Sequence, residues 1–129
     1  RVLFRSKRIL LVEDNALNAE ITLTILSDAG IQVEIAENGE IALYMLRTAD
    51  AGYYDLIIMD IQMPVMNGYQ AAKMIRKLPD SRSKIPIIAM TANAFEEDRR
   101  AAFEAGMNGY AAKPIEIEKL MRIIAETIN

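Results

Sequence analysis

The sequence predicts a single α/β domain in which five parallel strands form one sheet with helices on both faces. Two observations lead to this fold class. Short apolar runs alternate five times with segments of helical spacing along the 129 residues, which is typical of parallel strands joined by right-handed crossovers. The 52% hydrophobic and 26% charged residues are those of an ordinary globular protein, and the length suits one hydrophobic core.

Each strand is predicted from a short apolar run that is bounded by polar residues. The predicted strands are 8–13, 32–36, 55–59, 85–90 and 109–112. Five strands in a doubly wound sheet favour the flavodoxin-like order 2-1-3-4-5. Because Pro86 lacks the N–H that an internal strand needs, the fourth strand is expected to begin close to Ile85.

Five helices are predicted from apolar residues spaced three and four positions apart. In chain order their stripes are Leu17, Ile21, Thr24 and Ile25; Ile41, Ala42, Met45 and Leu46; Ala71, Ala72 and Ile75; Phe95, Arg99, Ala102, Phe103 and Gly106; and Ile117, Leu120, Met121, Ile124 and Ile128. Asn15 and Asn38 stand where helix N-caps belong, and Gly30 and Gly106 stand where helices end.

Composition excludes several classes of function. The net charge of −3 argues against a nucleic-acid-binding surface, and no apolar stretch approaches the roughly 18 residues that span a bilayer. The sequence has no cysteine and no histidine, so it offers neither a thiolate zinc site nor an imidazole base, and any histidine chemistry must come from a partner. We expect a cytoplasmic domain without membrane contact, since a chain free of cysteine suits a reducing compartment.

The domain is expected to cover residues 8–129, after a linker at residues 1–7. Basic residues are concentrated at this end: Arg1, Arg5, Lys7 and Arg8. A solvated linker accounts for them better than a phosphate-binding arm does. The first residues lack the apolar region of a signal peptide, and the chain begins with arginine rather than methionine. We therefore expect a piece of a longer protein, in which a membrane anchor can lie elsewhere.

Polar residues with chemical potential follow four of the predicted strands. They are Glu13 and Asp14 at the end of the first strand, Asp60 after the third, Thr91 after the fourth and Lys113 after the fifth. In a doubly wound sheet the ligand site lies beyond the carboxyl ends of the strands, at the crevice between the first and the third. Two carboxylates about 4 Å apart repel by roughly 4 kcal/mol at an effective dielectric constant near 20. The acids are therefore expected to retain a proton or to bind a hard cation.

Magnesium suits this set of residues, because it prefers a few carboxylates together with water and phosphate oxygens. A carboxylate can also attack phosphorus and form an aspartyl phosphate. Lys113 can supply a cation and Thr91 a hydroxyl for the phosphoryl oxygens, which carry charge during transfer. The strand ends therefore predict a site that captures a phosphoryl group.

Four segments together resemble the receiver domain of two-component response regulators. They are LVEDN at 11–15, MDIQMPVMNG at 59–68, MTANA at 90–94 and YAAKP at 110–114. One such segment is weak support, but four in this order and at this spacing are specific, and the resemblance covers roughly residues 8–128. The second segment is most similar to receivers that are fused to hybrid sensor histidine kinases.

The resemblance implies a role for each of these residues. Asp60 would be the phosphoacceptor, and Lys113 would pair with a phosphoryl oxygen. Thr91 would be a switch hydroxyl that turns toward the phosphoryl group. Asp14 would bind Mg²⁺ directly and Glu13 through water, with Mn²⁺ as an alternative metal.

Further positions have implied roles. The backbone carbonyl of Gln62 would join Asp60 among the metal ligands, and Tyr110 would be an aromatic rotamer switch. Gln62 and Asn93 match positions that tune the lifetime of the phosphate. Asn67 stands where the family more often has aspartate, which should change the charge of the loop and leave the phosphorylation chemistry intact.

The resemblance also implies partners and an outcome. The phosphoryl group would come from a phosphohistidine, so the partners are a histidine kinase domain, a histidine phosphotransfer domain or both. Phosphorylation would change the face formed by the fourth helix, the fifth strand and the fifth helix, and homodimerisation through that face is open. The domain would catalyse its own phosphorylation and dephosphorylation, and the parent chain would be a hybrid sensor histidine kinase.

Parts of this pattern also fit proteins other than a phosphorylated receiver. Taken singly, the residues have structural roles to fill: N-caps for Asp14, Asp60 and Thr91, a solvated surface for Lys113 and the core for Tyr110. A flavodoxin-type cofactor binder needs a phosphate cradle after the first strand, where the acids would repel phosphate. A dehalogenase-type phosphohydrolase needs a second aspartate where Gln62 stands. A receiver that serves only as a docking scaffold and is never phosphorylated stays open.

Overall fold

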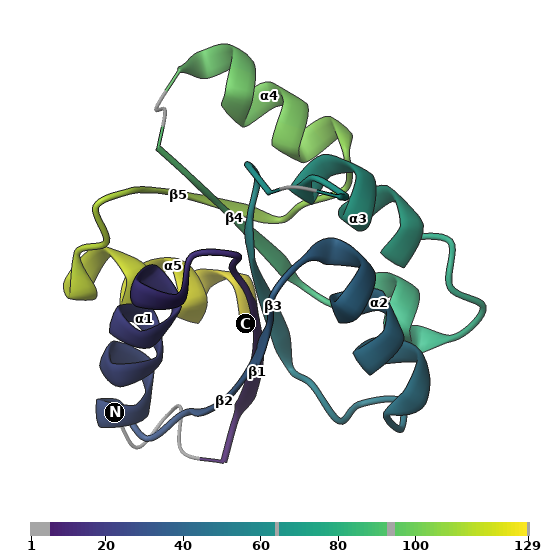
Figure 1. Ribbon diagram of the computed structural model, residues 1–129, viewed down its shortest axis with the longest axis horizontal. Helices are drawn as coiled ribbons and strands as arrows, with labels where there is room; N and C mark the ends of the chain where they lie inside the picture. The colour runs from purple at the N-terminus through teal and green to yellow at the C-terminus, as the bar shows by residue number, and fades with distance from the viewer. Residues whose placement is uncertain (1–5, 64, 93–94, 129) are drawn as a thin grey trace.

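The computed structural model describes residues 6–63, 65–92 and 95–128, and it confirms the predicted α/β architecture (Figure 1). The sheet is parallel, with its five strands in the order β2-β1-β3-β4-β5. The strands are β1 (Arg8–Val12), β2 (Gln32–Ala36), β3 (Leu56–Asp60), β4 (Ile87–Thr91) and β5 (Gly109–Ala112). The helices are α1 (Ala16–Asp28), α2 (Gly39–Thr48), α3 (Gly68–Ile75), α4 (Glu96–Glu104) and α5 (Ile117–Ile128), with a 3₁₀ turn η2 (Ser81–Lys84) before β4.

The helices form a layer on each side of the sheet. Helices α1 and α5 cover one face, and α2, α3 and α4 lie on the other (Figure 1). Residues of the central strands alternate between the two cores, so that Leu10 and Ile57 pack toward α2 and α3 while Ile9 and Ile58 pack toward α1 and α5. Burying each such side chain contributes about 1.5–3 kcal/mol. This double burial holds the carboxyl ends of β1, β3 and β4 in fixed positions.

The predicted strand boundaries are accurate to one residue except in the fourth strand. The predicted start at Ile85 was wrong, because β4 begins at Ile87. Pro86 precedes the strand, and its carbonyl accepts a hydrogen bond of 2.9 Å from the backbone N–H of Ile57. A proline can accept such a bond but cannot donate one, so it lies at the entrance to the ladder and not within it.

The predicted helix ends are confirmed. Asn15 and Asn38 are the N-caps of α1 and α2, and each side chain accepts a bond of 2.9 or 2.8 Å from the backbone N–H three residues later. Gly30 and Gly106 follow the C-caps of α1 and α4 with φ angles of +87° and +99°. Glycine adopts this left-handed conformation without the steric cost of a Cβ atom.

The predicted apolar stripe of α1 was wrong. Leu17 is 67% exposed and Ile21 is also exposed, whereas the residues that α1 buries are Ala19, Thr22 and Leu26. The helix carries apolar residues on more than one side, so spacing alone does not identify the side that meets the sheet.

The stripe of α4 was also wrong, and two others were right only in part. Phe95 and Phe103 are exposed, and Ala102 is the residue that α4 buries. Ile41 of α2 and Ile117 of α5 are exposed at the edges of their stripes. The stripe of α3 is buried as predicted, as are the central residues of α5.

The predicted linker lies largely outside the described ranges, which leave out residues 1–5. Within those ranges, no helix has the length and apolar character that crossing a lipid bilayer requires.

Candidate functional site

Three acids from two neighbouring strands meet at the carboxyl edge of the sheet. Glu13 and Asp14 follow β1, and Asp60 ends β3. The parallel register places Val12 opposite Met59, so the residues that come next lie side by side. A carboxylate oxygen of each acid lies within 4.8 Å of the others. Glu13 and Asp60 are only 2% and 4% exposed, while Asp14 faces solvent.

Lys113 bridges two of these carboxylates. Its Nζ lies 3.1 Å from Oε1 of Glu13 and 3.4 Å from Oδ2 of Asp60. The lysine follows β5, and its peptide bond to Pro114 is cis. Burial acts to lower the pKa of Lys113, but the hydrogen bond with Glu13 and the charges of both acids outweigh it, so the pKa is raised. The side chain therefore remains a cation at the centre of the acidic group.

One lysine does not balance three carboxylates. The pKa of Glu13 is raised, first by burial and then by its hydrogen bond and charge interaction with Asp60. Lys113 and the backbone N–H of Asn15, which is 3.3 Å from Oε2 of Glu13, act in the opposite direction. The cluster thus favours uptake of positive charge. Its hard oxygen donors fit a divalent cation such as Mg²⁺.

Thr91 and Tyr110, the predicted switch residues, are in contact with each other on β4 and β5, beyond the strand β3 that carries Asp60. Thr91 is buried at the end of β4, and the preceding Met90 pairs with Asp60 across the sheet. The pKa of Tyr110 is raised by burial and by the charge of Asp98, and a hydrogen bond with Thr91 acts against this rise. The threonine hydroxyl is therefore connected to an aromatic side chain that is half-buried in β5.

Of the predicted lifetime-tuning residues, Gln62 lies at the rim of the site. Its backbone N–H donates a bond of 3.3 Å to Oδ1 of Asp60, and its side chain is exposed. Gln62, Thr91 and Tyr69 line a hollow of about 470 Å³ next to the end of β3, where Asp60 lies. Asn93 lies outside the described residues.

A capping box and a glycine shape the start of α3, which follows the loop after Asp60. Asn67 and Gln70 form a capping box, with bonds of 2.9 and 3.0 Å between each side chain and the other's backbone N–H. Sequence reasoning missed this box, although its asparagine-x-x-glutamine signal was present. At Gly68 a Cβ atom would lie 2.7 Å from the carbonyl oxygen of Asp60 and 2.8 Å from Cα of Ile61. Only glycine lets α3 begin so close to Asp60.

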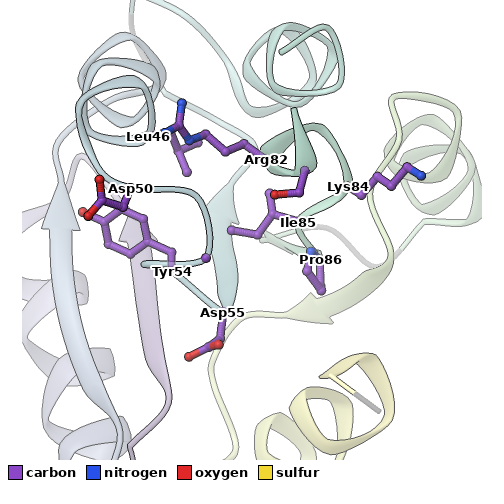
Figure 2. A pocket seen from close by; sticks show the side chains of 10 residues that line it. Leu46, Asp50, Tyr54, Asp55, Arg82, Lys84, Ile85 and Pro86 are labelled. Atoms are coloured by element: carbon purple, nitrogen blue, oxygen red, sulfur yellow. The ribbon is translucent and has the colours of Figure 1, made fainter. Parts of the chain in front are cut away.

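The opposite edge of the sheet has a hollow of about 240 Å³ with a different character (Figure 2). Figure 2 shows Arg82, on the segment before β4, reaching toward the segment after α2 that carries Asp50, whereas the side chains of Asp55 and Lys84 point away from each other. Nη2 of Arg82 donates a bond of 2.6 Å to the carbonyl of Ala49. In the described part of the chain, the acids at the carboxyl edge are the one group with a metal-binding arrangement.

Comparisons with known proteins agree with this geometry. A family model described as the response regulator receiver domain matches residues 9–125. Hybrid signal transduction histidine kinase G of Dictyostelium discoideum is 43% identical, over 91% of this chain and 3% of that protein. Sensor histidine kinase GacS of Pseudomonas protegens is 37% identical, over 93% of this chain and 13% of that protein. The chain therefore spans only a small part of the length of these relatives.

Solved structures show the same fold. The receiver domain of sensor histidine kinase PA1611 from Pseudomonas aeruginosa, which has a magnesium ion in its active site cleft, matches with a TM-score of 0.85 and 38% identity, covering 95% of this chain and 97% of that one. A co-crystal structure of the Saccharomyces cerevisiae histidine phosphotransfer protein Ypd1 with the receiver domain of Ssk1 matches with a TM-score of 0.85 and 33% identity, covering 96% of this chain and 90% of that one. The chain therefore belongs to the response regulator receiver domain family.

Proposed function

We propose that Asp60 accepts a phosphoryl group from a phosphohistidine of a partner, in a reaction that depends on Mg²⁺. The observation that carries the proposal is the group of three carboxylates within 4.8 Å of one another, with Lys113 bridging two of them. Such a group is poorly suited to an empty site and well suited to a cation and a phosphate. The chain has no histidine, so the phosphodonor must be a different domain or protein.

The side chains around Asp60 would each act on the transferred group. A P–O bond forms to the Asp60 carboxylate as the P–N bond of the phosphohistidine breaks. The ammonium of Lys113, already 3.4 Å from Oδ2 of Asp60, would pair with one phosphoryl oxygen. The hydroxyl of Thr91 would donate a hydrogen bond to another. Thr91 is held at the end of the buried strand β4 and Lys113 by its contacts with Glu13 and Asp60, so both groups need little rearrangement.

The metal would be bound by oxygen atoms that the strands bring together. We assign Asp14 and Asp60 as direct ligands, the backbone carbonyl of Gln62 as a third and Glu13 as a ligand through water. When bound, Mg²⁺ neutralises charge on the phosphoryl oxygens. Mn²⁺ prefers similar ligands and should replace it.

We infer that the contact between Thr91 and Tyr110 is part of a switch. Movement of Thr91 toward a phosphoryl group would break its hydrogen bond with Tyr110 and allow the ring to move inward. Such a switch shifts the balance between two existing states, typically by about 1–3 kcal/mol. Gln62 and Asn93 remain our assignments for residues that set the lifetime of the phosphate.

We further infer the context in which the domain works. The relatives named above support a hybrid sensor histidine kinase as the parent protein, and in such a protein we assign the domain to the cytoplasm. The neighbour solved with Ypd1 supports a histidine phosphotransfer domain as partner, and Leu17 and Ile21 offer it an exposed apolar surface directly after the acids. Exposed Phe103 and Ile117 support the face of α4, β5 and α5 as the site of a homodimer.

The experiment that tests the proposal is intact mass spectrometry after incubation with acetyl phosphate. We expect a gain of one phosphoryl group that requires Mg²⁺ and is absent in Asp60→Asn, whose circular dichroism should remain that of the wild type. Labelling of Asp60→Asn equal to wild type would place the acceptor elsewhere. If neither acetyl phosphate nor a phosphorylated histidine domain labels the wild type, the domain is an unphosphorylated docking module.

A further inference from the structure

Arg76, the C-cap of α3, makes four hydrogen bonds with one guanidinium group. Nε donates to the carbonyl of Gly106 at 2.9 Å, and Nη1 donates to the carbonyls of Ser83 and Ile85 at 2.8 and 2.7 Å. Nη2 donates to Oδ1 of Asn108 at 2.8 Å. All four acceptors are uncharged, and the ion pairs found among the described residues do not include Arg76. Its charge is therefore balanced by amide dipoles alone.

These bonds join elements that are distant in sequence. Ser83 and Ile85 lead into β4, while Gly106 and Asn108 lie between α4 and β5. Oδ1 of Asn108 also accepts a bond of 3.0 Å from the N–H of Ile87, the first residue of β4. The end of α3, the end of α4 and the starts of two strands thus meet at one side chain.

The junction is also tightly packed. A Cβ atom on Gly106 would lie 2.9 Å from Cγ of Arg76, and the φ angle of +99° at Gly106 is one that other residues rarely adopt. Arg76 is partly buried at this junction, and that burial lowers the pKa of its guanidinium group. Moving the guanidinium out of this position is costly, because its four hydrogen bonds would be broken.

Helix α4 is held unequally at its two ends. At the C-terminal end, Ala102, Ala105 and Met107 are buried in the core. At the other end Phe95 is exposed and its side chain makes no capping bond, and the first turn is tied to α3 by a bond of 3.4 Å from the Tyr69 hydroxyl to the carbonyl of Asp98. The weakly held end is the one that follows β4 and its terminal threonine.

We propose that Arg76 is a positioning residue that fixes the C-terminal end of α4, so that phosphorylation of Asp60 displaces the first turns of this helix and leaves its last turn in place. The inference rests on the function proposed above. Thr91 lines the same hollow as Tyr69 and as Asp98 of the first turn of α4, so a shift of Thr91 would change the packing of that end, and the helix can yield by turning about Gly106. Packed junctions change between discrete arrangements and do not deform smoothly, so a fixed end converts a small shift into a rotation.

Hydrogen–deuterium exchange tests this division of α4. Wild type and Arg76→Met are compared in Mg²⁺, with and without beryllofluoride, a stable mimic of an acyl phosphate. In the wild type we expect the mimic to change exchange at residues 96–100 and to leave residues 105–108 unchanged. In Arg76→Met the change should extend to residues 105–108, with exchange there altered about fivefold by the mimic.

Two further variants separate positioning from general loss of stability. Arg82→Met removes a comparable arginine whose bonds, to Ala49 and Asp80, do not reach α4, so its response to the mimic should match the wild type. Arg76→Lys restores the charge but not the forked geometry, and its response should lie between those of wild type and Arg76→Met. Should Arg76→Met fail to fold, Asn108→Ala can replace it, because it removes one of the four acceptors. In this variant the change in exchange should also extend to residues 105–108, but more weakly.

The outcomes are distinguishable. If Arg76→Met, or Asn108→Ala in its place, shows the wild-type pattern of response, the positioning role is overturned while the phosphoacceptor function stands. If Arg82→Met spreads the response as Arg76→Met does, the effect is one of stability and the role is likewise overturned. If the wild type neither gains a phosphoryl group nor responds to the mimic, the proposed function fails and this inference fails with it.

Discussion

Lys113 and Glu13 are 100 positions apart in the sequence, yet Nζ of the lysine lies 3.1 Å from Oε1 of the glutamate. The pair brings together the carboxyl ends of β1 and β5, which are not neighbours in the sheet. In the same position the lysine reaches Asp60 at 3.4 Å. The ammonium group of Lys113 therefore already lies beside the carboxylate to which, in the function proposed above, a phosphoryl group would be attached.

Replacing this lysine tests both roles of the ammonium. In Lys113→Met without Mg²⁺, we expect the free energy of unfolding to fall by about 2–4 kcal/mol, because two buried carboxylates lose their counterion. The rate of Asp60 labelling should fall about 100-fold, a typical cost of losing one electrostatic stabiliser. Urea titration and intact mass measure the two effects. A loss of Mg²⁺ affinity as large as the loss of labelling would contradict the assignment of Lys113 to the phosphoryl group.

Asp14 should stabilise the protein only when a metal is present. In metal-free solution we expect Asp14→Asn to raise the free energy of unfolding by about 1 kcal/mol, since one of three mutually repelling charges is removed at an exposed position. Addition of Mg²⁺ should stabilise the wild type by mass action and leave the variant unchanged. Glu20→Gln, at an exposed acid of α1, is the control. Equal stabilisation of both proteins by Mg²⁺ would remove Asp14 from the metal site.

Thr22 offers a test of polar burial in α1. Its side chain is fully buried, and among the described residues its hydroxyl has no hydrogen-bond partner. Thr22→Val should therefore raise the free energy of unfolding by about 1 kcal/mol. Thr24→Val is the matched control, because the exposed Thr24 hydroxyl donates to the carbonyl of Glu20 at 2.9 Å. A destabilised Thr22→Val would mean that the hydroxyl has a partner, such as a buried water.

Gly68 is expected to be essential for the position of Asp60, the proposed acceptor. In Gly68→Ala the new Cβ would lie 2.7 Å from the carbonyl oxygen of Asp60, so either α3 or the end of β3 must shift. We expect labelling to slow about tenfold or more, since misplacement by about 1 Å can be that costly. Ala71→Gly, at a buried position of the same helix, lowers stability without touching Asp60 and serves as the control. Wild-type labelling in Gly68→Ala would show that α3 moves away freely.

Tyr54 should make stability depend on pH in alkaline solution. Burial, and next its hydrogen bond to Glu34 at 2.8 Å, raise the pKa of Tyr54 above the ordinary 10.0. The unfolded chain therefore loses this proton first, and stability that is complete below pH 10 is lost as the pH rises further toward the folded-state pKa. Tyr54→Phe should be less stable at neutral pH by about 1 kcal/mol and show a shallower decline above pH 10.

Tyr53 provides the comparison for that experiment. Its hydroxyl bonds the other carboxylate oxygen of Glu34 at 2.7 Å, but its side chain is much more exposed than that of Tyr54. Tyr53→Phe should flatten the alkaline decline less. Chemical denaturation at several pH values measures both slopes, and parallel curves for wild type and Tyr54→Phe would refute the expectation.

Strand positions and the meeting of the acids could be predicted from the sequence. The strands β1, β3 and β4 are buried on both faces, so each is a continuous apolar run with a visible end. In a parallel sheet all such ends lie at one edge. Asp60 and Glu13 had to come together once the strand order was known.

Contacts that depend on the paths of loops could not be predicted. Whether α1 buries Leu17 or Leu26 depends on where the sheet lies, because both residues are apolar. The pairing of Lys113 with Glu13 requires the course of the chain after β5. The bonds of Arg76 require three separate segments to converge, and no local spacing in the sequence indicates that they do.

The topology also determines where the polypeptide leaves the domain. Strand β1 starts at Arg8, on the edge of the sheet away from the acids. Helix α5 runs back to that edge, since a Cβ atom on Gly109, the first residue of β5, would lie 3.2 Å from Oγ1 of Thr127. The described chain therefore enters and leaves the domain at the edge of the sheet opposite Glu13, Asp14 and Asp60, so that neither of its described ends crosses the edge where the acids meet.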